Sequence, residues 1–210
     1  MAKTIRPRPH TQSSRPRSGT YWVLDRRQIL CLVSARRHDL LDKLAAVGPL
    51  SIRELAPLVG ASAASLYHHV GKLLKVGLVL QVGERTVKRK KEKVYGTLAP
   101  RMRLSRSYAN PANRAVVDKL AAGLMRQIER DFRRGSRSPF AYFTGSRRNI
   151  GLARLVGAPS RQELARINGL FEHIAEILWA SAGRKGPLVS VAWSLAPVLV
   201  RRTQRERAGS

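Results

Sequence analysis

Residues 60–79, GASAASLYHHVGKLLKVGLV, contain an apolar stripe with helical spacing. Leu66, Val70 and Leu73 recur every three or four residues, which predicts a helix with one buried side. Ser62 is a good N-cap residue and Gly77 a typical C-terminal glycine, so the helix is expected over residues 62–76. With about 100° between successive residues, the side chains expected to point away from the core are Ala64, Ser65, His68 and Lys72, with Tyr67 and His69 on the two flanks.

The residues on both sides of this helix extend the pattern. Upstream, SIRE at 51–54 has the form of a capping box and predicts a short helix to about Leu58, followed by a turn at Gly60. Apolar residues at helical spacing over 25–47 predict two further helices, with Cys31 as a small core residue. Downstream, strands expected at 78–82 and 94–98 enclose a charged turn at 84–93, which together predict a β-hairpin with a basic tip.

This order resembles the winged helix-turn-helix repressors of the arsenic-repressor-like superfamily over about residues 24–100. The resemblance is carried by LLDKLAAVGPLSIRELAPLVGASAASLYHHVGKLLKVGLV at 40–79, with a serine at the helix start, His69-Val70 in its middle and Gly-Leu-Val at its end. It implies a DNA-binding domain over 21–100, in which the helix at 62–76 reads the major groove and the hairpin is the wing.

The net charge of +27 indicates a polyanionic partner, because such an excess of positive charge repels itself in the folded chain. Double-stranded DNA is the expected partner. Small and polar side chains allow a helix to approach base edges, whereas long cations near a groove bind phosphates. The expected contacts on the helix are Ser62, Ala64, Ser65, Tyr67, His68 and Lys72. Those on the wing are Arg85, Lys88, Arg89, Lys90, Lys91 and Lys93. His69 lies nearer the buried stripe and is assigned to the scaffold.

Other functions find little support in the sequence. Adjacent histidines diverge by about 100° on a helix and cannot chelate one ion. Metal sensors of the superfamily carry a cysteine pair before the recognition helix, or Asp and His clusters on a C-terminal helix, and the sequence has neither. We therefore expect no metal and no cofactor. Without a phosphate-binding loop or nucleophile motif the chain is not expected to be an enzyme. The lone cysteine and the lack of a signal sequence or membrane span predict a cytoplasmic protein with no membrane partner.

The C-terminal half, residues 101–200, is expected to have a different role. An amphipathic helix over 111–134 is predicted to pair with its two-fold mate in a homodimer. A strand at 149–156, a helix from the capping box SRQE at 160–163 to about Ala182, and the alternating PLVSVAWSLAPV at 187–198 predict a small strand-helix-strand accessory unit. It would serve dimerisation or bind a small-molecule effector. Its aromatic residues would form a core or line a pocket: Phe140, Tyr142, Phe143, Phe171, Trp179 and Trp193.

The overall fold class expected is mainly α with a β-wing, an α+β protein, with a disordered basic arm at 1–20 and a disordered basic tail at 201–210. The function expected is a sequence-specific transcriptional regulator, acting as a dimeric repressor. The alternative is a non-specific nucleic-acid-binding protein associated with the nucleoid or with RNA.

Overall fold

The computed structural model describes residues 19–198 and has a mixed α+β architecture. Except for residues 19 and 20, the basic arm expected over 1–20 lies outside the described residues, as does the tail expected over 201–210. The helices are α1 (Arg26–Leu32), α2 (Ala35–Val47), α3 (Ile52–Val59), α4 (Ala63–Lys75), α5 (Arg114–Gly135) and α6 (Arg161–Ala180). The strands are β1 (Thr20–Trp22), β2 (Leu50–Ser51), β3 (Val79–Val87), β4 (Lys90–Thr97) and β5 (Arg101–Arg103), and two short 3-10 turns, Ser105–Ala109 and Pro111–Asn113, precede α5.

Helices α1 to α4 enclose the hydrophobic core, and their ends lie close to the positions that the sequence predicted. The largest fully buried side chains include Ile29, Leu40, Leu55, Leu66 and Leu73, one or more from each helix. Cys31 is also buried, as expected for a small core residue. Truncating such a leucine to alanine costs about 2–5 kcal/mol, so this core accounts for much of the stability of the fold.

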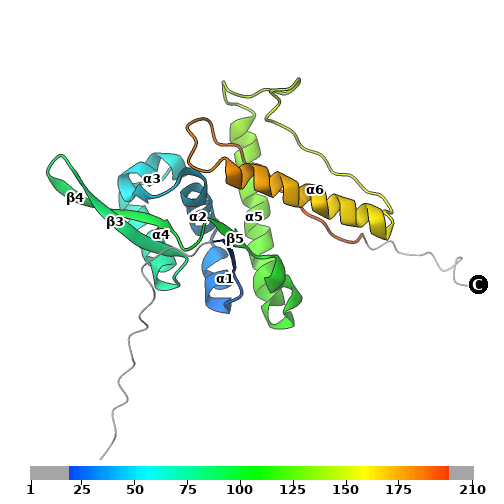
Figure 1. Cartoon of the computed structure of the whole chain (residues 1–210), viewed down its shortest axis with the longest axis horizontal. Helices are drawn as coiled ribbons and strands as arrows, with labels where there is room; N and C mark the ends of the chain where they lie inside the picture. Colours follow the sequence, from blue (N-terminus) through cyan, green and yellow to red (C-terminus); the bar gives the residue numbers. More distant parts are fainter. Residues whose placement is uncertain (1–18, 199–210) are drawn as a thin grey trace, which may run out of the picture.

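Local hydrogen bonds fix the corner between α3 and α4. Ser51 and Glu54 form the predicted capping box at the start of α3. Gly60 then adopts the left-handed conformation, with φ 63° and ψ 48°, which glycine reaches without the steric cost of a Cβ. Ser62 caps α4 by accepting a hydrogen bond from the backbone N–H of Ser65 at 3.3 Å. The two helices are therefore joined by a short turn whose geometry the sequence specifies (Figure 1).

Strands β2, β4 and β3 form an antiparallel sheet in that order, and the β3–β4 hairpin projects away from the helices (Figure 1). The register runs from Val79 opposite Thr97 to Val87 opposite Lys90, with an irregularity between Gln81 and Gly83. The charged turn predicted over 84–93 is wrong in extent, because the turn consists of Lys88 and Arg89 alone. Glu84 is opposite Lys93 and Arg85 is opposite Glu92, so oppositely charged residues face each other across β3 and β4. These pairs allow the backbone pairing of the two strands to continue through the charged segment.

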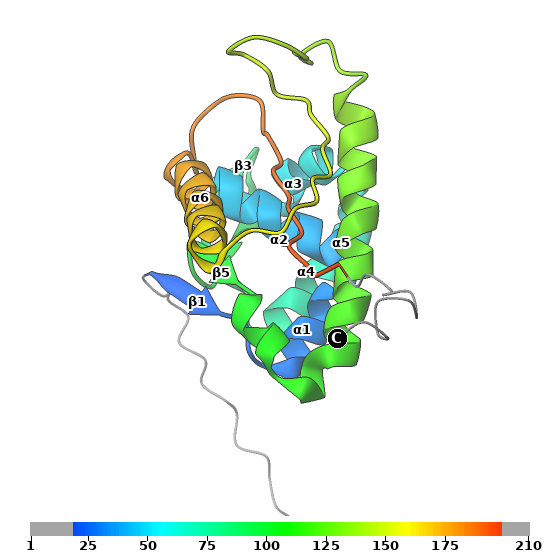
Figure 2. The ribbon, with the colours of Figure 1, turned by 90° about the vertical axis from the view of Figure 1, so that its right-hand side faces the viewer.

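Helix α5 packs against α1 and α2 and joins the C-terminal half to the core (Figure 2). Its buried residues are Val116, Leu120 and Gly123. A Cβ added at Gly123 would lie 3.1 Å from the carbonyl oxygen of Val33, so a side chain there would push α5 away from the end of α1. The apolar side of the predicted amphipathic helix consists of Val117, Leu120, Ala121, Leu124, Ile128 and Phe132. Of these only Leu120 is buried, and the others stay partly or fully exposed.

Helix α6 begins with the predicted capping box, formed by Ser160 and Glu163, but contains no buried residue. Arginines of β5 hold it to the body of the protein. Arg103 lies over the ring of Trp179 at 4.7 Å and pairs with Glu172 at 2.6 Å, while Arg101 pairs with Glu176 at 2.9 Å. The hydrogen bond from Arg103 lowers the pKa of Glu172. Polar and cation–π contacts, rather than a core, therefore fix α6 in place.

The strand-helix-strand accessory unit is not what the structure contains, since neither 149–156 nor 187–198 forms a strand. A strand needs a neighbouring backbone to pair with. Within the described chain no backbone hydrogen bond reaches 187–198, and in 149–156 only the N–H groups of Asn149 and Ile150 donate, both to the carbonyl of Tyr142. The aromatic residues of this region form neither a core nor an enclosed pocket, because Phe140, Phe143 and Trp193 are exposed. Trp193 stacks on Phe171 with ring centroids 5.0 Å apart. Over residues 19–198, no helix is both long and apolar enough to cross a bilayer.

Candidate nucleic-acid interface

Helix α4 presents a polar face to solvent, and this face contains the residues singled out in the sequence. Leu66, Val70 and Leu73 are buried, so the opposite side of the helix is open. Six exposed residues at its start and on this side are here called the outward face of α4: Ser62, Ala64, Ser65, Tyr67, His68 and Lys72. Tyr67 is the most prominent of them, with 64% of its surface exposed. The small residues near the start of α4 leave its backbone open to close approach.

His69 is turned partly inward, in line with its assignment to the scaffold. Its Nδ1 atom is buried and has no hydrogen-bond partner, and its ring lies edge-on to that of His68 at 5.7 Å. Burial lowers the pKa of His69, and the nearby cations Arg37 and Arg36, with Lys72 and His68, lower it further. Both burial and the neighbouring cations therefore disfavour the protonated form of the imidazole.

Two ion pairs dock the hairpin onto the start of α3. Arg53 pairs with Glu92 of β4 at 3.3 Å. Arg85 of β3 pairs with Glu54, and its guanidinium also donates a hydrogen bond to the Ser51 hydroxyl at 3.3 Å. Arg85 and Glu92 are directly opposite each other in the β3–β4 register. The four side chains therefore form a row in which positive and negative charges alternate: Arg53, Glu92, Arg85 and Glu54. The structure thus places Arg85, a predicted DNA contact, in a partly exposed intramolecular pair.

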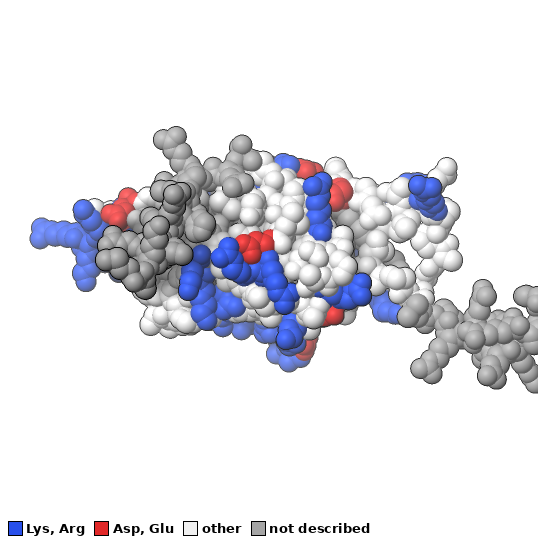
Figure 3. Space-filling view, turned by 90° about the horizontal axis from the view of Figure 1, so that it is seen from below, with Lys and Arg blue, Asp and Glu red and all other residues white. Residues whose placement is uncertain are grey.

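The remaining basic residues of the hairpin are free to bind an anion. All of them are exposed and, within residues 19–198, none takes part in a salt bridge. These hairpin cations are Lys88, Arg89, Lys90, Lys91 and Lys93. Lys91 and Lys93 are opposite Thr86 and Glu84, on the face of the hairpin that does not carry Arg85. Figure 3 shows basic side chains protruding at the hairpin end of the molecule and gathered along its underside.

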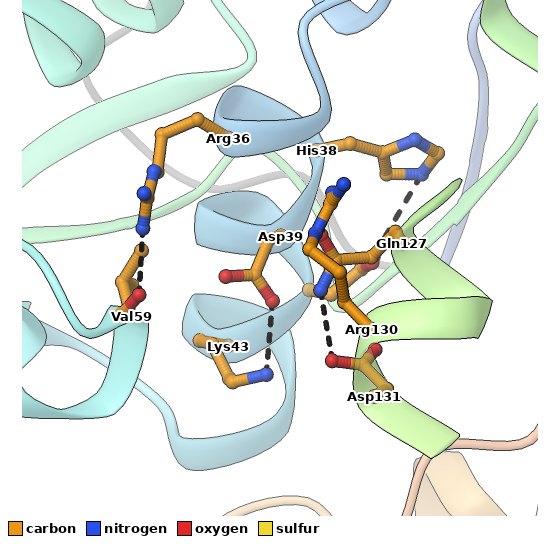
Figure 4. Close-up of polar contacts among 9 residues, drawn as sticks. Arg36, His38, Asp39, Lys43, Val59, Gln127, Arg130 and Asp131 are labelled. Carbon is orange, nitrogen blue, oxygen red and sulfur yellow. Dashed lines mark hydrogen bonds and ion pairs between the residues drawn. The ribbon is translucent and has the colours of Figure 1, made fainter. Parts of the chain in front are cut away.

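Arg36 and Arg37, in the first turn of α2, were missed by the sequence analysis. Arg36 donates a hydrogen bond to the carbonyl of Val59 at 2.7 Å and so ties α2 to the end of α3 (Figure 4). Arg37 donates to the carbonyl of Cys31. Both add positive charge near His69 on α4. The adjacent arginines are visible in the sequence, but only the packing of α2 against α4 brings them close to His69.

Polar residues line the junction of α2 and α5 on another side of α2. Asp39 pairs with Lys43 at 2.9 Å, and Gln127 donates to Asp131 at 2.8 Å (Figure 4). A cavity of about 10 Å³ at this junction has room for roughly one water molecule. Among the described residues, no group of three His, Cys, Asp or Glu side chains is arranged to hold a metal ion.

Comparison with known proteins gives a match that includes the candidate interface. A protein-family model described as HVO_A0114 matches residues 32–97. The match runs from the end of α1 to the end of β4, and so includes α4 and the hairpin but neither α5 nor α6. No curated protein matches the chain.

Proposed function

We propose that the chain is a sequence-specific DNA-binding transcriptional regulator of the winged helix-turn-helix type, acting in the cytoplasm as a homodimeric repressor. The main support for this proposal is the outward face of α4, because it is polar, exposed and adjacent to a hairpin with five cations that form no salt bridge within residues 19–198. In this proposal α3 and α4 are the helix-turn-helix and β3–β4 is the wing. The sheet order β2-β4-β3 supports it, since β2 directly precedes α3 and anchors the hairpin beside that helix.

The two parts of the surface have different roles. Tyr67 and His68 project from the middle of α4 and would reach base edges in the major groove, which carry the sequence information. The hairpin cations would bind phosphates, which add affinity without discriminating between sequences. Arg85 orients the hairpin through Glu54 and is not assigned to DNA. A two-fold dimer would then read an inverted repeat with half-sites about one helical turn apart.

The test begins with selection of bound duplexes from a random pool, followed by affinity measurements on the selected and on random DNA. Tyr67→Ala and His68→Ala should lower affinity for the selected site far more than for random duplex, so that the ratio of the two affinities falls. Lys90→Ala with Lys91→Ala should weaken both by similar factors. Lys75→Ala, at the far end of α4, is the matched control. Folded Tyr67 and His68 variants that both keep the parental ratio would refute the assignment of α4.

A second candidate is supported by the excess positive charge, which favours any polyanion. A non-specific nucleic-acid-binding protein would select no motif and would be displaced from one duplex by an equal mass of another. The regulator should instead retain a large preference for its site, with an affinity that falls steeply as salt rises because bound phosphates release counterions.

A further inference from the structure

The C-terminal half of the chain lacks a core of its own. From Leu124 to Val198 no residue is buried. Most of the large apolar side chains that are exposed in the described chain also lie beyond residue 138, among them Leu152 at 78% and Leu155 at 92%. So many exposed large apolar side chains in one half of a chain point to a surface that another molecule covers.

Residues 187–198 of this half are here called the tail segment. They have the alternating sequence pattern of a strand, but they pair with no other strand in the described chain. Apolar residues alternate with small or polar ones over Val189, Ser190, Val191, Ala192 and Trp193. In the described chain no backbone hydrogen bond reaches this segment, which crosses the molecule as an extended trace (Figure 2). A row of unpaired backbone donors and acceptors is a template for pairing with another strand.

Charge identifies a second copy of the chain as a suitable partner. Two copies that each carry +27 repel each other across most of their surface. From Gly186 to Val200, however, the sequence has no charged side chain. Two tail segments can therefore meet without like charges opposing each other. An antiparallel pair is also self-complementary about a two-fold axis, so that one contact satisfies both copies.

We propose that the tail segment pairs antiparallel with the tail segment of a second copy, forming a two-stranded ribbon across the dimer axis. The inference rests on the homodimer of the proposed function and assigns the surface that forms it. The Phe171–Trp193 stack holds each segment against α6, so pairing brings the two α6 helices together. The face that carries Val189, Val191, Trp193 and Leu195 then turns toward α6 and becomes buried.

Disulfide mapping tests the register of this pairing. Single cysteines are introduced into the full chain at Val189, Ser190, Val191, Ala192, Ser194 and Leu195, with Cys31→Ala in every variant. In an antiparallel pair about a two-fold axis only the position nearest the axis faces its own copy, and each further residue separates the two copies by roughly 7 Å more. Cross-linking should therefore peak at one position and fall on both sides. The exposed Thr86→Cys, on the hairpin, is the control and should not cross-link.

Sedimentation equilibrium tests the buried face. Val191→Asn should weaken dimerisation by about a hundredfold, since each dimer loses two buried valines. Ser190→Asn, on the opposite face of the same segment, should change it by less than about fivefold. Circular dichroism checks that both variants keep the parental helix content.

The outcomes separate this inference from the proposed function. A dimer that cross-links at no position, or equally at all of them, would overturn the tail pairing and leave a dimeric regulator using another surface. A chain that is monomeric at micromolar concentration, alone or bound to a different protein, would overturn both the pairing and the homodimer. The ratio of specific to random DNA affinity tests the role of α4 independently of either result.

Discussion

The tip of the hairpin offers a test that links backbone conformation to DNA binding. Lys88 and Arg89 have φ angles of 46° and 65°, in the left-handed region. A two-residue hairpin turn with both φ angles positive favours Asn-Gly, whereas Lys-Arg has Cβ atoms that crowd the backbone. Replacing Lys88 by Asn and Arg89 by Gly should therefore relieve strain at the turn while removing two cations.

The size of the effect follows from the conformations. A residue with a Cβ pays about 1–2 kcal/mol in the left-handed region, and glycine loses roughly 0.5–1 kcal/mol through its greater freedom in the unfolded chain. The double variant should thus raise the free energy of unfolding by about 1 kcal/mol, visible as a higher urea midpoint or a Tm higher by about 2–4 °C. Removal of two phosphate contacts should make the slope of log K against log salt shallower by up to about 1.8.

A matched variant separates strain from charge. Lys90→Asn with Lys91→Gly makes the same two replacements in β4, where neither residue has a positive φ. It should lower the free energy of unfolding by about 0.5–1 kcal/mol, because glycine weakens a strand, and should change the salt slope by a similar amount. If the variant at 88 and 89 is less stable than the parent, the left-handed turn is not the native conformation and the reasoning fails.

Three further predictions concern residues of α3, α4 and α5 that support the candidate interface. The pKa of His69 is lower in the folded protein than in the unfolded chain, so the unfolded chain takes up the proton first as pH falls below about 6.5. The free energy of unfolding should therefore decline below that pH. His69→Gln should reduce this decline in urea titrations at pH 7.5 and 5.5. Glu54→Ala removes the capping box and the partner of Arg85 and should cost about 1–2 kcal/mol in the same titration. Gly123→Ala should lower the Tm through its approach to Val33, whereas Gly169→Ala, with no neighbour in reach, should raise it.

The sequence predicted the N-terminal half closely because its signals are local. The capping box at Ser51, the glycine at 60 and the N-cap at Ser62 each act within a few residues, and the structure places helix ends at all three. The hairpin turn was predicted wrongly because Lys88 and Arg89 carry no Asn or Gly signal. Strand β5 was not predicted, since it has only three residues and its partner β1 lies about eighty residues earlier.

The C-terminal predictions failed for a different physical reason. Alternation over 187–198 predicted a strand that the structure does not contain, because a strand also requires a partner, which a sequence pattern does not supply. Apolar residues also recur at helical spacing along α6, at Leu164, Ile167, Phe171, Ile174 and Leu178. This spacing is a property of the helix alone, and Leu164 stays 38% exposed. Arg85 of the candidate interface is a similar case. Its charge is evident from the sequence, but its pairing with Glu54 depends on how the hairpin packs against α3.

The docking of the hairpin has a consequence for how salt acts on the proposed DNA surface. The pairs Arg53–Glu92 and Arg85–Glu54 join the hairpin to α3, and α3 in turn packs on α4. Partly exposed pairs of this kind contribute no more than about 1 kcal/mol each and weaken as salt rises. Rising salt should thus weaken the contacts with phosphates and also weaken the ion pairs that hold the hairpin against α3. The slope of log K against log salt then contains an intramolecular part, and the Glu54→Ala variant, which has already lost one pair, should have the shallower slope although it keeps every cation of the hairpin.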